Sequence, residues 1–129
     1  MPAAAVNRIT RSEIGDDCAI HALARYLEGA SYEDVLRAAA LIEKRYNGSA
    51  GLYTKTMIRV GAKLGHTLRH RKPRDLEDAY GVLLFDGHAV MVRGGLVFEA
   101  DATVWELTDY LRTTAASHGA PCGLLVAVE

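Results

Sequence analysis

The sequence has little cysteine, little proline and no long apolar run, and each scarcity excludes a class of protein. Its 129 residues include two cysteines and three prolines. Two cysteines leave one disulfide open but cannot form a disulfide framework, so we expect a reducing, cytoplasmic location. No stretch approaches the ~20 apolar residues of a transmembrane helix, so we expect no membrane partner. Residues 1–7 are too weakly apolar for a signal peptide.

An excess of charge of one sign is also absent. The formal net charge is −1 at pH 7, half of the residues are hydrophobic and 24% are charged. This balance is typical of an ordinary globular protein and indicates no nucleic-acid partner. A local basic run at 66–74 lacks the interleaved aromatics needed for base stacking, so we interpret it as solvated surface. The length predicts a single domain over 1–129, with 1–12 as a loosely ordered arm.

Hydrophobic periodicity predicts helices in the first half of the chain and strands in the second. Apolar residues at helical spacing follow Cys18, and Ser31 with an acid three residues later resembles a capping box. The expected helices cover 18–28, 31–42, 54–65 and 103–113. The expected strands cover 66–71, 80–85, 88–93, 96–101 and 123–128, and 47–51 reads as a loop. Helices followed by a mostly antiparallel sheet define an α+β class.

Cys18 stands at the expected N-terminus of the first helix. The helix dipole and the free N–H groups there favour a thiolate, and the same N–H groups could hold an oxyanion. Asp16 and Asp17 precede it, and either could cap the first turn. A cysteine is also a common small packing residue, so this position alone does not establish a nucleophile.

His88 begins an expected strand directly after a turn signal. A two-residue turn at Gly94-Gly95 would place His88 opposite Asp101, on the same face of the sheet. A carboxylate beside an imidazole fixes its tautomer and stabilises its cation. A slip of one residue would place Ala100 or Ala102 there instead. The alternative is a surface histidine with an incidental acid nearby.

Two blocks of sequence resemble the papain-like cysteine peptidases. Residues 15–24, followed by 31–35, look like the nucleophile helix of that superfamily, and 87–101 look like its histidine hairpin. The likeness is greatest to small bacterial and phage members and to bacteriocin-processing peptidase domains. It is confined to 15–35 and 87–101 of the 129 residues.

The resemblance implies a papain-like hydrolase that acts on an amide or peptide bond. Cys18 would attack the carbonyl, His88 would move the proton, and Asp101 would orient His88. Asp16, Asp17 and Gly87 fall at positions that line the oxyanion or the substrate. Peptidase, isopeptidase and deamidase chemistry all remain open, the substrate is a peptide or protein, and no cofactor or metal is expected.

Two alternatives come from other classes. Such enzymes usually carry Gln or Asn a few residues before the cysteine, but Ser12 stands there and Asn7 is the only amide upstream. A non-catalytic papain-like binding or inhibitor protein, such as a phage-encoded protein that acts on a host partner, would explain that difference. The second alternative is a Cys2His2 zinc site, built from the weak spacings Cys18-x2-His21 and His118-x3-Cys122. Otherwise His21, one helical turn after Cys18, is expected to be structural.

Overall fold

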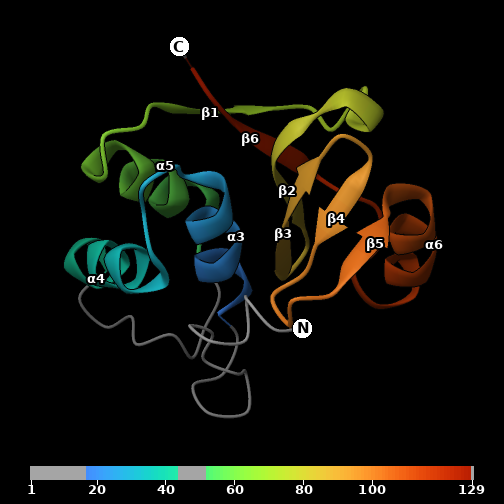
Figure 1. Ribbon diagram of the computed structural model, residues 1–129, viewed down its shortest axis with the longest axis horizontal. Helices are drawn as coiled ribbons and strands as arrows, with labels where there is room; N and C mark the ends of the chain where they lie inside the picture. The colour runs from blue at the N-terminus through green and yellow to red at the C-terminus, as the bar shows by residue number, and fades with distance from the viewer. Residues whose placement is uncertain (1–16, 44–51, 129) are drawn as a thin grey trace.

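The computed structural model describes residues 17–43 and 52–128. Within these ranges it contains four α-helices, a short 3-10 helix η1 (Leu76–Asp78) and one six-stranded antiparallel sheet (Figure 1). The expected α+β class is therefore confirmed. The expected arm at 1–12, the loop at 47–51 and the position of Asp16 lie outside the described residues.

Three helices come first along the described chain: α3 (Cys18–Tyr26), α4 (Tyr32–Ile42) and α5 (Thr54–Lys63). The expected capping box at the start of α4 is present, with both hydrogen bonds between Ser31 and Asp34 at 3.1 Å. Helix α3 is buried on more than one side, because it packs against both the sheet and the other two helices. It is therefore the central helix of its layer.

The sheet has the strand order β1-β6-β2-β3-β4-β5. Its strands are β1 (Leu68–Arg71), β2 (Tyr80–Phe85), β3 (His88–Arg93), β4 (Leu96–Phe98), β5 (Val104–Glu106) and β6 (Gly123–Ala127). The last strand, β6, pairs with both β1 and β2. Gly81 allows β2 and β6 to approach closely, because a Cβ there would lie 2.4 Å from the carbonyl oxygen of Leu125.

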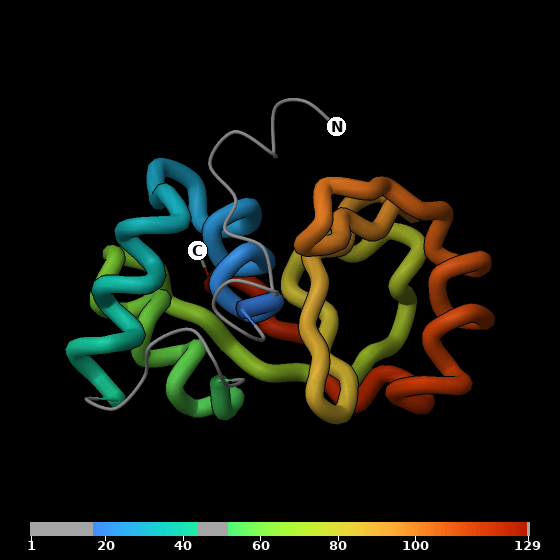
Figure 2. Tube along the Cα trace, turned by 90° about the horizontal axis from the view of Figure 1, so that it is seen from below, coloured from blue at the N-terminus to red at the C-terminus, as the bar shows by residue number. Residues whose placement is uncertain are grey.

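Helices cover both faces of the sheet. Helices α3, α4 and α5 pack on one face, and α6 (Leu107–His118) packs on the other (Figures 1 and 2). Side chains on β2 alternate between the layers: Val82 and Leu84 face α3, whereas Leu83 and Phe85 face α6. A fully buried Leu or Val contributes roughly 1.5–3 kcal/mol, so this double burial anchors the central strands.

The segment after β4 differs from the sequence prediction. Strand β4 ends at Phe98, and the expected helix at 103–113 is replaced by strand β5 followed by the later helix α6. Trp105 pairs with Val97 in the sheet, because the β-branched and aromatic residues at 104–105 suit a pleated ladder. A turn joins β4 to β5, with Ala102 at a φ of +75°. The predicted helix therefore starts too early. The helical spacing of apolar residues that is typical of α6 already begins at 103–106, so the sequence pattern did not separate the strand from the helix.

Candidate active site

A small cavity brings together Cys18 and His88. It has a volume of about 100 Å³ and lies where the first turn of α3 meets the start of β3. Leu52 and Met57 line it from the segment that enters α5, and Cys122 lines it from the segment before β6. The two residues expected to carry the chemistry therefore line one cavity, although they lie far apart in the sequence.

Cys18 is the first residue of α3 and is buried, with 3% of its surface exposed. Its backbone N–H belongs to the first turn of the helix, where such groups have no partner within the helix. The positive end of the helix dipole also lies there and favours a negative charge on sulfur. Gly87, an expected substrate-lining residue, lines the same cavity. The local geometry therefore suits an anionic sulfur or an oxyanion.

Asp17 lies in the N-cap position but its side chain makes no capping hydrogen bond, so the expected cap at this residue is wrong. The carboxylate is instead fully buried. Its Oδ2 atom accepts a hydrogen bond from the Tyr32 hydroxyl at 2.7 Å and pairs with Nε2 of His21 at 3.0 Å. The carboxylate thus joins α3 to α4, and His21 has the structural contacts expected of it.

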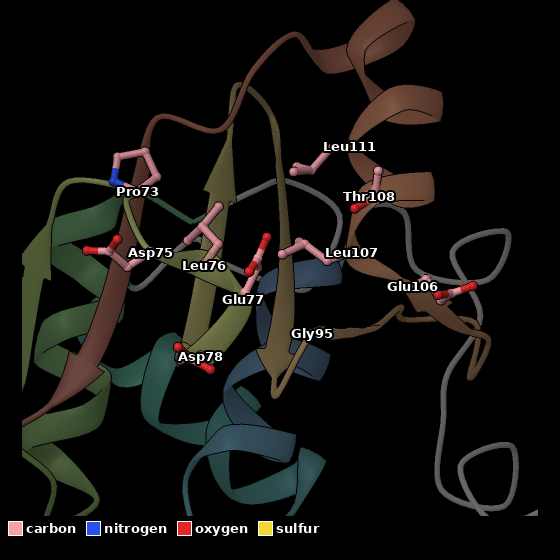
Figure 3. A pocket seen from close by; sticks show the side chains of 10 residues that line it. All are labelled: Pro73, Asp75, Leu76, Glu77, Asp78, Gly95, Glu106, Leu107, Thr108 and Leu111. Carbon is pink, nitrogen blue, oxygen red and sulfur yellow. The ribbon is translucent and has the colours of Figure 1, made fainter.

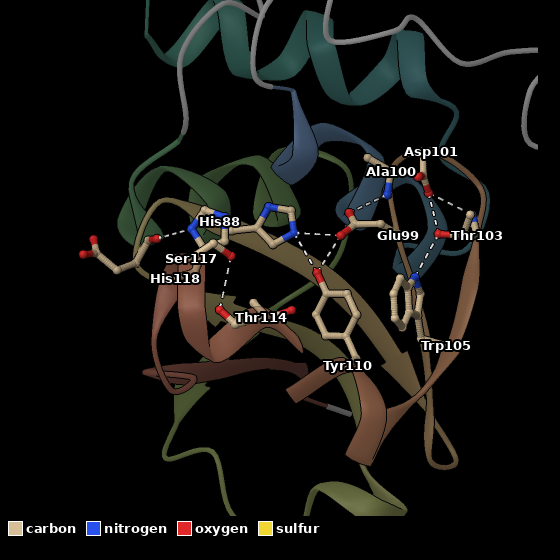
Figure 4. Close-up of polar contacts among 11 residues, drawn as sticks. His88, Glu99, Ala100, Asp101, Thr103, Trp105, Tyr110, Thr114, Ser117 and His118 are labelled. Carbon is tan, nitrogen blue, oxygen red and sulfur yellow. Dashed lines mark hydrogen bonds and ion pairs between the residues drawn. The ribbon is translucent and has the colours of Figure 1, made fainter. Parts of the chain in front are cut away.

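The imidazole of His88 lies in a network of hydrogen bonds (Figure 4). Its Nε2 atom is 3.0 Å from Oε2 of Glu99 and 2.8 Å from the hydroxyl of Tyr110. The Tyr110 hydroxyl donates to the same Glu99 oxygen at 2.5 Å. The other oxygen of Glu99 accepts the backbone N–H of Ala100 at 2.8 Å. Both carboxylate oxygens are thereby satisfied.

The charge state of Glu99 follows from these contacts. Burial by itself would raise the pKa of Glu99. The hydrogen bonds from His88 and Tyr110, the charge of His88 and the N–H of Ala100 outweigh burial and lower this pKa to about 2. Glu99 is therefore an anion at neutral pH.

Asp101, the expected partner of His88, lies elsewhere. The predicted hairpin register is present, with Arg93 opposite Leu96 and Met91 opposite Phe98. The ladder ends there, however, and the chain turns before it reaches Asp101. The exposed Asp101 accepts hydrogen bonds from the backbone N–H and the hydroxyl of Thr103, at 2.9 and 2.6 Å. The carboxylate that contacts His88 is that of Glu99.

Glu99 and Tyr110 were not identified from the sequence as site residues. Glu99 follows the apolar stretch Leu96-Val97-Phe98, and a carboxylate at the end of such a strand was the available signal. The ring of Tyr110 packs with its centroid 6.0 Å from that of Phe85 and 5.7 Å from that of Trp105, while its hydroxyl reaches the network.

His118 stacks on His88, which the sequence did not predict. The two ring centroids are 4.8 Å apart, with an angle of 12° between the planes. Nδ1 of His118 lies 2.9 Å from the carbonyl oxygen of Asp86. A carbonyl only accepts, so this nitrogen carries a hydrogen and donates. The stacked ring therefore restricts the orientation of His88 from one side.

The zinc alternative gains no support from the placement of its residues. Nε2 of His21 pairs with Asp17, and Nδ1 of His118 bonds to a carbonyl oxygen. Within 17–43 and 52–128, no group of three His, Cys, Asp or Glu side chains is placed to hold a metal ion.

A larger hollow lies on the α6 side of the sheet (Figure 3). It has a volume of about 610 Å³ and lies between η1 and the start of α6. Its polar lining comes from the carboxylates of Asp75, Glu77, Asp78 and Glu106. The lining includes no cysteine and no histidine, so the smaller cavity is the better candidate for thiol chemistry.

Comparison with known proteins leaves the chain without a match. No family model matches it, and neither does any curated protein or solved structure. The described part of the chain also contains no helix with the length and apolar character to cross a bilayer. Functional inference therefore depends on the motifs and on the geometry around Cys18.

Proposed function

We propose that this protein is a papain-like cysteine hydrolase that cleaves an amide or peptide bond of a peptide or protein in the cytoplasm. One observation carries the proposal: Cys18 and His88 line the same cavity, and His88 is held by a partly buried, ionised Glu99. A nucleophile, a base and a group that orients the base form the minimal set for this chemistry.

In the proposed reaction, the Cys18 thiolate attacks the substrate carbonyl and a tetrahedral oxyanion forms. The N–H groups of the first turn of α3 stabilise that charge. Protonated His88 then gives its proton to the leaving amine, and the carbon–nitrogen bond breaks. Water, deprotonated by His88, attacks the thioester, and Cys18 leaves as the thiolate.

The contacts of His88 assign each ring nitrogen a role. Nε2 bonds to Glu99 and Tyr110, so the proton transfers to and from Cys18 and the substrate fall to Nδ1. Glu99 is a positioning residue that fixes this tautomer and stabilises the imidazolium. It takes the role that the family resemblance gave to Asp101.

A second candidate function, a binding protein without turnover, is favoured by one observation. The side chain directly before Cys18 is the buried carboxylate of Asp17, whose Oδ2 is already bonded to Tyr32 and His21. An ionised carboxylate only accepts hydrogen bonds, so it cannot help to stabilise an oxyanion. A protein with this fold that only binds a host protein would not need a hydrogen-bond donor for an oxyanion.

Alkylation of the folded protein by iodoacetamide at pH 6 separates the two functions. Free cysteine has a pKa of ~8.5 and is mostly protonated at this pH, so a stabilised thiolate at Cys18 should react at least about tenfold faster than Cys122. His88→Ala should remove most of this advantage. Glu99→Gln should remove part of it, and Asp101→Asn, the matched control, should remove none. Equal rates of Cys18 alkylation in wild type and His88→Ala would contradict the hydrolase and favour the binding protein.

A further inference from the structure

Both cysteines of the chain line the cavity that contains His88. Cys18 is buried at the start of α3, whereas Cys122 is exposed just before β6. The Cys122 backbone N–H donates to the carbonyl oxygen of Leu84 at 2.8 Å, which fixes its backbone at the end of the sheet. The hydrolysis proposed above uses only one of these thiols, so the second has no role in it.

We propose that Cys122 is a resolving thiol, which captures oxidised Cys18 in a reversible disulfide. The inference rests on the proposed function in one respect, namely that Cys18 reacts as a thiolate. It adds a modification site and a form of regulation to the same cavity. Oxidation would stop hydrolysis, and reduction would restore it.

The oxidant is a hydroperoxide such as hydrogen peroxide. The Cys18 thiolate attacks one peroxide oxygen, so a sulfur–oxygen bond forms, the oxygen–oxygen bond breaks and hydroxide leaves. The product is a sulfenic acid. The Cys122 sulfur then attacks the Cys18 sulfur, a disulfide forms and the sulfur–oxygen bond breaks. Water leaves with the proton of Cys122. The two thiols lose two electrons in total, and the peroxide gains them.

The shape of the cavity favours a resolving thiol from the chain itself. A volume of about 100 Å³ holds only a few water molecules, and Leu52, Met57 and Leu84 make much of its wall apolar. Hydrogen peroxide fits such a space. Cys122 already lines it.

The test treats folded full-length protein with one equivalent of hydrogen peroxide, blocks the remaining thiols with iodoacetamide and maps the peptides by mass spectrometry. We expect a peptide pair linked through Cys18 and Cys122, lighter by two hydrogens and separated by dithiothreitol. Cys122→Ser, which keeps the size of the side chain, should give sulfenic and sulfinic acid at Cys18 instead. Before oxidation, the rate of Cys18 alkylation in this variant should equal the rate in wild type, which shows that the cavity is intact.

Three results would overturn the inference. In the first, wild type forms sulfinic acid at Cys18 at the same peroxide dose as Cys122→Ser does, and no linked peptide is found. Another is the absence of any oxidation at Cys18. The third is a linkage only between different molecules, seen as a dimer on a non-reducing gel. Because the linked peptide is detected without a substrate, the inference and the hydrolase can fail independently.

Discussion

The molecule contains two clusters, each made of a carboxylate, a histidine and a tyrosine. One lies in the layer of α3 and α4, and the other lies on the side of the sheet that α6 covers. In the first, Asp17 binds His21 and Tyr32 between two helices. In the second, Glu99 binds His88 and Tyr110 where β3 begins and β4 ends. In each, one carboxylate oxygen contacts both partners. The same three chemical groups therefore occur in two environments, and the environment decides what they can do.

The two clusters differ in solvent access and in how fully they are satisfied. The Asp17 side chain is fully buried, and among the described residues its Oδ1 has no hydrogen-bond partner. The Glu99 side chain is 16% exposed, and both of its oxygens are bonded. An unsatisfied buried acceptor costs about 1–3 kcal/mol, so the first cluster is a stability liability as well as a link. The second is complete, and its histidine lines the cavity.

The largest effect on stability should come from breaking the buried cluster. Asp17→Ala removes the acceptor that His21 and Tyr32 share, and each lost hydrogen bond to a buried group costs about 1–3 kcal/mol. Urea denaturation at pH 7 measures this loss. Glu99→Ala is the matched variant in the other cluster, and we expect a smaller loss because that site is partly exposed. A larger loss for Glu99→Ala would reverse the comparison.

The second prediction uses the lowered pKa of Glu99, which is about 2 compared with an ordinary value of 4.5. A depressed carboxyl pKa stabilises the folded state above the unfolded value, and this contribution is lost as pH falls from about 5 towards 2. Its size is at most about 3 kcal/mol. Urea denaturation at pH 7, 5 and 3 should show a shallower decline for Glu99→Gln than for wild type. Parallel curves for the two proteins would contradict the network.

The third prediction separates the tyrosines. Tyr32→Phe and Tyr110→Phe each remove one hydrogen bond to a carboxylate, which costs about 1.5–3 kcal/mol. Both variants should therefore lose similar stability. Only Tyr110→Phe should slow the alkylation of Cys18, by less than about tenfold, because only that hydroxyl contacts His88. A slowdown of equal size in Tyr32→Phe would show that the first cluster also serves the reaction.

The smallest effect should come from the ring stacked on His88. His118→Phe keeps a flat ring of similar size, whereas His118→Ala removes it. An aromatic pair contributes roughly 0.5–1.5 kcal/mol, so the alanine variant should slow the alkylation of Cys18 a few-fold and the phenylalanine variant less. If the phenylalanine variant is the slower of the two, the contact acts through the polar atoms of His118 and not through its ring.

The sequence predicted those features of the fold that depend on neighbouring residues. The turn at Gly94-Gly95 has positive φ angles of 56° and 81°, which is the twist that a two-residue hairpin prefers, and the predicted register follows from it. The capping box of Ser31 is equally local. The position of β6 between β1 and β2 was not predictable, because periodicity reports which face of a strand is buried and not which strands are neighbours.

The candidate site was predictable only in part, for a related reason. Cys18 and His88 stand out by their positions at the start of a helix and of a strand. The acid partner depends on where β4 stops, and extending the ladder by three residues led to Asp101. The longer side chain of Glu99 reaches Nε2 of His88 once the chain leaves the ladder. The alternation of apolar and polar residues along a strand does not predict how far a side chain reaches after the strand has ended.

The insertion of β6 has a consequence for how the protein is made. Strands β1 and β2 are both bonded to β6, so the sheet remains in two parts until residues 123–127 have emerged from the ribosome. Cys122 lies next to that strand, so the part of the Cys18 cavity that Cys122 lines is also completed late. A reactive thiol would thus be assembled only when synthesis of this region is complete. Ribosome-bound chains stalled before residue 123 should show slow, unassisted alkylation of Cys18, and fast alkylation there would disprove this order of assembly.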